Sequence, residues 1–109
     1  MPISSRLAVR LAVAVSILVS ASSVRADDKS AGTYRQKCAA CHGPDGKAQT
    51  PAGKNLGVLS FGDPAVAKMT DAELSAVIEK GKGKMPSYGK TMNADEIKAM
   101  VAYVRSLGK

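Results

Sequence analysis

The chain has 109 residues, which is enough for one domain. Its sixteen Lys and Arg exceed its nine Asp and Glu by seven, but three of the basic residues fall within the first 26 positions. The remainder therefore carries a net charge of only +4, with basic residues scattered singly and few aromatic residues among them, which argues against a nucleic-acid-binding protein. With one Phe, three Tyr and no Trp, the domain also lacks the large apolar side chains that a small core needs.

Residues 1–26 differ in character from the rest and predict a secretory signal peptide. They contain three Arg and no acidic residue, an apolar stretch at 11–19, small residues at 20–23, and Ala26 before the expected cut. The alternative is an uncleaved membrane anchor, but its apolar stretch is shorter than the ~20 residues that a spanning helix needs. We therefore expect cleavage after Ala26 and a periplasmic domain, residues 27–109, without stable membrane insertion.

The first helix of this domain is predicted over residues 30–40, with Tyr34 and Cys38 one turn apart on the same face. It is expected to end near Gly43, because Pro44 cannot continue a helix.

The end of this helix holds the pattern Cys38-Ala39-Ala40-Cys41-His42, which predicts covalent attachment of one c-type haem. Cysteines three positions apart lie on one side of a helical turn, so both sulfur atoms can bond the vinyl groups of a single haem. The following residue, His42, is then carried to the iron as an axial ligand. The haem would also supply the apolar core that the side chains do not provide.

Other interpretations of the two cysteines stay open. In an oxidising compartment Cys38 and Cys41 could form a disulfide, whereas a thioredoxin-like redox pair needs a βαβ context that the sequence does not contain. A structural zinc site needs four ligands, and the chain offers two Cys and its single His, His42.

Two long segments are predicted to form loops. Residues 43–62 are rich in Gly, Lys and polar residues and show no periodicity, and residues 81–92 are similar. Loops of this length in a small domain are usually packed against something or functional.

Three further helices are predicted from their caps and apolar spacing. The caps are Asp63 with Pro64 for a short helix to Lys68, Thr70 with Glu73 for a helix to Gly81, and Asn93 with Glu96 for the last helix. The last helix carries an i, i+3, i+4, i+7 stripe of Ile97, Met100, Val101, Val104 and Leu107. No segment alternates like a strand, so the fold class is expected to be all-α.

The sixth iron ligand is expected to be a methionine, because His42 leaves the other face of the iron open. Met69, Met85, Met92 and Met100 are the candidates. Met100 belongs to the apolar stripe of the last helix, where core packing explains it. Met85 is an apolar residue in a Gly- and Lys-rich loop, and Pro86 restricts it to an extended conformation. Met85 is therefore favoured, Met92 is second, and an open site is third.

Methionine coordination favours ferrous iron and raises the reduction potential relative to a second His. With both axial positions filled, the iron has no vacancy for oxygen or peroxide. This favours an electron carrier over an enzyme.

The chain resembles class I cytochrome c, especially the small bacterial and cytochrome c6-like members. The matching features span almost the whole of residues 27–109. They are Tyr34 ahead of Cys38-x-x-Cys41-His42-Gly43, the loop Met85-Pro86-x-Tyr88-Gly89, and the closing Tyr103-Val104-x-x-Leu107. The family usually has a Gly where Ser30 stands here, and many members have a Pro, whose carbonyl orients the imidazole, where Lys54 stands here.

The resemblance implies a small cytochrome c fold of about four short helices wrapped around one covalently bound haem. It implies that the first and last helices cross, so that Tyr34 and Tyr103 lie at their contact. It also implies that Leu56 lines the haem pocket and that Tyr88 packs near the methionine side. No acceptor for the His42 N–H can be named.

The expected function is that of a soluble periplasmic carrier that shuttles single electrons between redox complexes, most simply as a monomer. Four lysines around Met85 could form a basic docking rim for an acidic partner, or could be ordinary solvated residues: Lys80, Lys82, Lys84 and Lys90. The alternatives are a haem protein with a labile or open sixth site, acting in ligand sensing or peroxidase-type catalysis, and a haem-free domain closed by a disulfide.

Overall fold

The computed structural model describes residue 16 and residues 23–109. The predicted signal peptide therefore lies largely outside the described residues, although residues 23–26 form the first turn of a helix. The cut after Ala26 stays a prediction. None of the helices within the described ranges is long and apolar enough to cross a bilayer.

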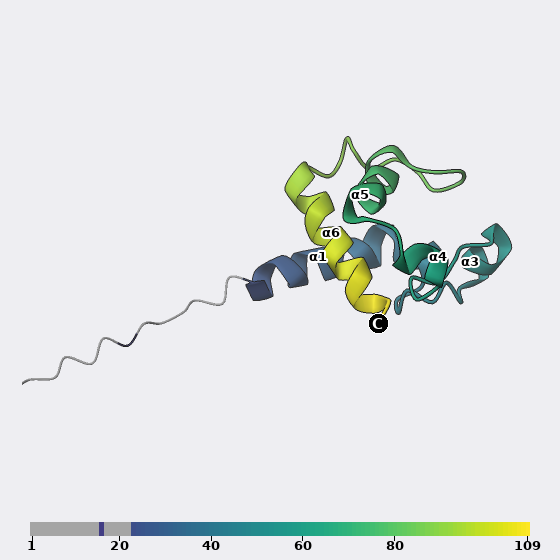
Figure 1. Cartoon of the computed structure of the whole chain (residues 1–109), viewed down its shortest axis with the longest axis horizontal. Coiled ribbons are helices and arrows are strands. Elements are labelled where there is room, and N and C mark those ends of the chain that lie inside the picture. Colours follow the sequence, from purple (N-terminus) through teal and green to yellow (C-terminus); the bar gives the residue numbers. More distant parts are fainter. Residues whose placement is uncertain (1–15, 17–22) are drawn as a thin grey trace, which may run out of the picture.

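The regular secondary structure of the described chain consists of helices joined by loops (Figure 1). They are α1 (Ser23–Lys37), α2 (Ala39–His42), α3 (Pro51–Leu56), α4 (Pro64–Ala67), α5 (Asp71–Lys80) and α6 (Ala94–Leu107). Residues 23–109 contain no strand, only an isolated bridge between Lys82 and Met85. The all-α prediction is confirmed.

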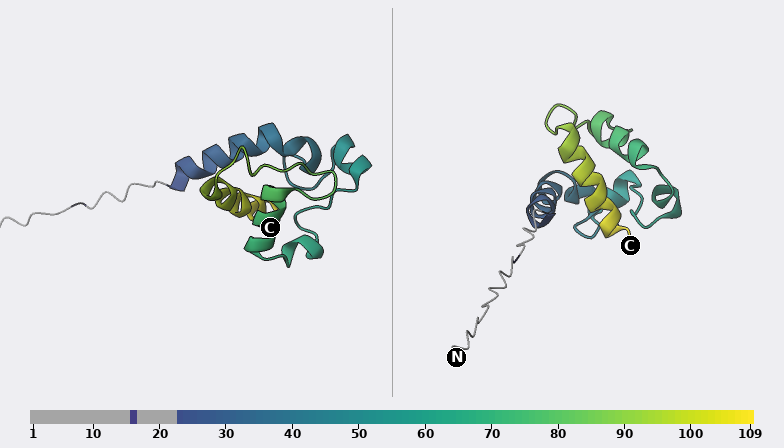
Figure 2. Two further views of the ribbon diagram at one scale, coloured as in Figure 1. Left: turned by 90° about the horizontal axis from the view of Figure 1, so that it is seen from above. Right: turned by 60° about the vertical axis from the view of Figure 1, so that its left-hand side comes forward.

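The frame of the molecule is the long helix α6, which packs across α1 on one side and α5 on the other (Figures 1 and 2). Its predicted apolar stripe supplies half of the buried core, whose members are Tyr34, Leu74, Ile78, Met92, Ile97, Met100, Val101 and Val104. At the crossing, the ring of Tyr103 lies 5.2 Å from the fully buried ring of Tyr34. The predicted helix crossing is therefore confirmed, with Ser30 also buried in this part of α1.

The predicted caps form as expected. Thr70 and Asn93 each accept a bond from the backbone N–H three residues later, and Glu73 and Glu96 bond back to the cap N–H groups. The Asp63 carboxylate accepts from the Ala65 N–H at the start of α4. Because these caps satisfy N–H groups that a helix leaves unpaired, they fix where each helix begins.

Three predictions of helix boundaries were wrong. The first helix begins at Ser23 rather than at residue 30. The first helix does not run unbroken to residue 40, because α1 ends at Lys37 and α2 begins after Cys38. The segment 43–62 is not a continuous loop, because it contains α3. Thr50 caps α3 through the Gly53 N–H, Pro51 occupies its first turn, and Gly57 ends it at a φ of 65°. With six residues, α3 is too short to show apolar periodicity.

Candidate haem-binding site

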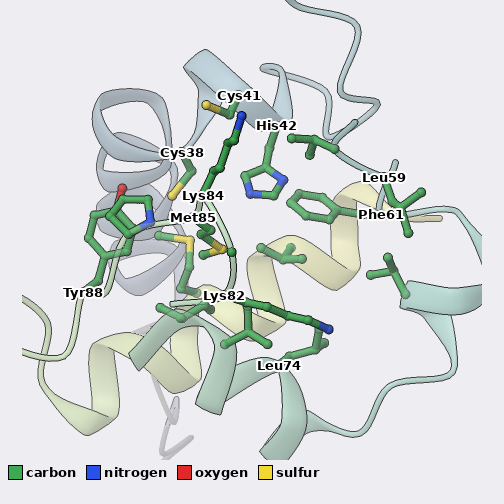
Figure 3. A pocket seen from close by; sticks show the side chains of 18 of the residues that line it. Cys38, Cys41, His42, Leu59, Phe61, Leu74, Lys82, Lys84, Met85 and Tyr88 are labelled. Carbon is green, nitrogen blue, oxygen red and sulfur yellow. The ribbon is translucent and has the colours of Figure 1, made fainter. Parts of the chain in front are cut away.

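A single cavity of about 540 Å³ gathers the predicted site residues, a size typical of cofactor pockets. All six of them line it: Cys38, Cys41, His42, Leu56, Met85 and Tyr88. Figure 3 shows them with labels, except Leu56. Most of the remaining lining side chains are apolar and come from α5, α6 and the chain around α3 and α4. Two parts of the chain supply the chemically distinctive groups. We call residues 38–61 the His42 wall and residues 81–92 the Met85 loop.

The backbone after His42 is held by buried hydrogen bonds. The Tyr34 hydroxyl donates to the Gly43 carbonyl at 2.6 Å within the core, and burial raises the pKa of Tyr34 far above its ordinary value, so that its proton is retained. The Ala48 N–H donates to the His42 carbonyl at 2.8 Å. Gly43 has a φ of 80°, a conformation that glycine adopts without strain. This turn fixes where the His42 side chain begins.

The imidazole of His42 is packed against Phe61, whose ring centroid lies 4.9 Å away at an interplanar angle of 24° (Figure 3). Its Nδ1 atom is buried and has no hydrogen-bond partner among the described residues, so no carbonyl orients the ring there. Burial lowers the pKa of His42, which favours the neutral imidazole that binds metal ions. Sequence reasoning missed Phe61, because a lone aromatic residue in an aperiodic segment gives no signal of its partner.

Helix α3 packs directly onto the attachment segment. The Thr50 hydroxyl donates to the Ala40 carbonyl at 2.7 Å and also lies 3.3 Å from the Cys41 carbonyl oxygen. Gly53 is buried, and a Cβ there would overlap the Cys41 carbonyl oxygen and lie 2.8 Å from that of Ala48. Close contact of two backbones therefore holds Cys41 against α3.

The thiols of Cys38 and Cys41 are half-buried, and neither forms a disulfide. Burial raises the pKa of the Cys38 thiol, although Lys37 acts in the opposite direction. Within the described ranges, no three His, Cys, Asp or Glu side chains converge as a metal site. The disulfide and zinc interpretations thus receive no support from the geometry.

The Met85 loop is held mainly to the end of α5. The Tyr88 N–H donates to the Ile78 carbonyl, and the Gly89 N–H donates to the Glu79 carbonyl, both at 3.0 Å. Met85 and Lys82 exchange two backbone hydrogen bonds, which form the isolated bridge. These bonds keep Met85 at the cavity although its loop has no regular structure.

All four candidate methionines line the cavity: Met69, Met85, Met92 and Met100. Met100 is almost fully buried, as its place in the α6 stripe predicts, and Met92 is also a core residue. Met85 is half-buried on a loop. Its side chain is therefore less tightly packed in the core than those of Met92 and Met100, and is freer to bind a metal ion.

The donor set and the apolar lining fit a haem. Two thiols and an imidazole come from the His42 wall, and thioethers from other parts of the lining. Leu56 and Leu59 are the large apolar side chains most exposed within the described part of the chain, at 40% and 51%, and both line the cavity. An apolar group in the cavity would remove this surface from water.

The four lysines of the predicted docking rim are all exposed, but they are not equivalent. Lys82 and Lys84 line the cavity (Figure 3), whereas Lys80 and Lys90 are not among its lining residues.

Comparisons with known proteins agree with this geometry. Residues 25–104 match the family described as "Cytochrome C oxidase, cbb3-type, subunit III". The chain is 34% identical over 84 residues to the Cbb3-type cytochrome c oxidase subunit FixP of Azorhizobium caulinodans, covering 73% of this chain and 27% of that protein. It thus spans about a quarter of the length of this curated relative. Its structure is similar to that of the KustC0563 c-type cytochrome, with a TM-score of 0.67 and 33% identity over 73% of this chain and 98% of the other.

Proposed function

The chain belongs to the family of cbb3-type cytochrome c oxidase subunit III, and with it to the class I c-type cytochromes, and on this premise we propose that it is a periplasmic one-electron carrier whose haem iron is bound by His42 and Met85. Members of the family carry covalently bound haem c, and Cys38 and Cys41 stand in the attaching positions.

The observation that carries this proposal is the composition of one cavity. Its lining includes both thiols, a neutral imidazole packed against Phe61, and the Met85 thioether on a loop. A soft thioether paired with an imidazole is the ligand set of high-potential carriers. His42 is the single histidine of the chain, so a second histidine of this chain cannot bind the iron beside it.

When bound, the haem supplies the exchange of one electron between Fe(III) and Fe(II). The residues of this chain supply everything around it. Cys38 and Cys41 would tether it, and His42 and Met85 would bind its iron, where the thioether would favour the ferrous state and so raise the reduction potential. The apolar lining would limit access of water, and an iron bound by both His42 and Met85 would have no vacancy for oxygen or peroxide.

Visible spectra of the purified holoprotein test this proposal. We expect low-spin c-type bands, with the weak red band of iron–methionine bonding in the oxidised form. Met85→Ala should remove that band, while Met92→Ala should retain it. A band lost only in Met92→Ala would assign the ligand to Met92. A high-spin wild-type spectrum would overturn the carrier in favour of a haem with an open sixth site.

The signal peptide is tested by the mass of the protein recovered from the periplasm. A chain that begins at Asp27 agrees with cleavage after Ala26, and a retained leader would indicate an anchor.

We further propose that Lys82 and Lys84 steer encounters with an acidic redox partner, because both are exposed at the cavity. The FixP relative is a subunit of an oxidase, which supports a partner within a respiratory complex. The double variant Lys82→Gln/Lys84→Gln should slow electron transfer at low salt and flatten its salt dependence. Lys98→Gln, which neutralises an exposed lysine of α6 away from the cavity, is the control. Equal effects in both variants would contradict a specific docking surface.

A further inference from the structure

The break between α1 and α2 frees a backbone carbonyl beside the attachment cysteines. In an unbroken helix the Lys37 carbonyl would accept a hydrogen bond from the Cys41 N–H, four residues later. Here the Cys41 N–H bonds to the Cys38 carbonyl instead, at 3.3 Å, because Cys38 departs from helical geometry with φ −116° and ψ −37°. The Lys37 carbonyl is thus left without its helical donor.

The Tyr88 hydroxyl takes this place and donates to the Lys37 carbonyl at 3.0 Å. Tyr88 lies in the Met85 loop, three residues after Met85 itself. The other hydrogen bonds that fasten this part of the loop go to α5, from the Tyr88 and Gly89 N–H groups and from the Ser87 hydroxyl. Among the described residues, the Tyr88 hydroxyl makes the one hydrogen bond between the Met85 loop and α1.

The position of the Tyr88 ring agrees with a role at the haem. It lines the cavity and lies beside Cys38 (Figure 3). Partial burial raises the pKa of Tyr88, so the hydroxyl keeps the proton that it donates.

We propose that Tyr88 is a positioning residue, whose hydroxyl fastens the Met85 loop to the residue before Cys38 and so limits how readily Met85 yields the sixth iron position to an incoming small ligand. This inference rests on the proposed function in that Met85 is taken as the iron ligand. Without the bond, the remaining hydrogen bonds from the loop to other described elements go to α5 alone. Gly81 and Gly83, with φ values of 76° and 57°, then give its first part the freedom to swing away.

Imidazole binding to the oxidised holoprotein tests this role, because a ligand that enters through a rare open state binds at a rate proportional to the population of that state. Tyr88→Phe removes the hydroxyl and keeps the ring. We expect its visible spectrum to retain the red band and its imidazole binding to be about five-fold faster, the change that loss of one hydrogen bond of ordinary net strength produces.

Two control variants separate positioning from general stability. Tyr103→Phe removes a hydroxyl that bonds no other described residue, and Thr70→Ala weakens the α5 cap far from the loop. Both should bind imidazole at the wild-type rate. A wild-type rate in Tyr88→Phe would overturn the inference, and so would an equal acceleration in Thr70→Ala. Failure of the proposed function is recognised separately and before imidazole is added, by a red band that survives Met85→Ala.

Discussion

The His42 wall and the Met85 loop both line the cavity, but they are held in place by different interactions. In the His42 wall, the imidazole packs on Phe61, the turn after it is bonded to buried Tyr34, and α3 presses Gly53 against the Cys41 backbone. The Met85 loop has no helix or strand of its own, and its side chains are half-buried or exposed except at its end, Met92. Its hydrogen bonds to other described elements are a few to the end of α5 and one to α1.

This difference in support indicates which part of the site is rigid and which part can move. The His42 wall carries the covalent attachments, whose geometry must hold in both redox states. In the proposed holoprotein the Met85 loop contributes one thioether bond to the iron, and its support is softer than that of the His42 wall. Local stability is expected to follow the same division, since segments with few buried contacts open most readily.

The largest expected effect comes from overfilling the His42 wall. Gly53→Ala places a Cβ against two backbone carbonyls, which cannot move like a flexible side chain, and should destabilise the holoprotein by about 3 kcal/mol. In Gly83→Ala, in the Met85 loop, the added Cβ has no neighbour within 4 Å, and the cost comes only from the positive φ. A loss of stability of about 1 kcal/mol is therefore expected. Denaturant unfolding measures both. A loss in Gly53→Ala no greater than that in Gly83→Ala would remove the contrast between the two regions.

A second comparison applies the same substitution to each region. Tyr34→Phe removes one of the two donors to the buried Gly43 carbonyl, which keeps only the Gly46 N–H, and should cost about 1.5 kcal/mol. Tyr88→Phe breaks an exposed bond and should cost about 0.5–1 kcal/mol. The rate of imidazole binding should rank the two variants in the opposite order. Equal stabilities, measured as denaturant midpoints, would indicate that burial does not distinguish the two hydroxyls.

The smallest expected effect on stability comes from Glu96, at the α1–α6 crossing. Because Glu96 lies outside both the His42 wall and the Met85 loop, its substitution serves as a reference for the two regions. The Asn93 N–H and the Lys29 ammonium, 3.2 Å away, lower the pKa of Glu96 from its ordinary value of 4.5. The stabilisation is therefore present above the pKa of the unfolded chain and is lost as the pH falls through the lowered folded value.

Glu96→Gln should accordingly be slightly less stable than the wild type at about pH 6, and the difference should disappear in acid, at about pH 3. Thermal unfolding at a series of pH values measures this. The haem spectrum and imidazole rate should not change. A stability difference that persists unchanged in acid would show that the Glu96 charge is not its source.

The sequence predicts this fold best where the determining interactions join residues that are close in the sequence. The capping boxes at Thr70 and Asn93 and the α6 stripe depend on residues three or four apart, and all formed as predicted. Helix α3 had a readable cap at Thr50-Pro51 and a readable end at Gly57, but no periodicity linked them. The features of the site that were missed are non-local: Phe61 against His42 and the Tyr88 bond to Lys37 join residues whose proximity only the folded chain determines.

The crossing of α1 and α6 has a consequence for the order of events as the chain is synthesised. The attachment segment is complete once residue 42 has been made, whereas one side of the cavity consists of Met100, Val101 and Val104 near the end of the chain. Closing the loop between these helices has the largest entropic cost of any contact in the domain. A chain emerging N-terminus first therefore presents its cysteines long before the cavity exists. Attachment machinery would meet an open peptide rather than a finished pocket, and the last helix would close over a group already in place.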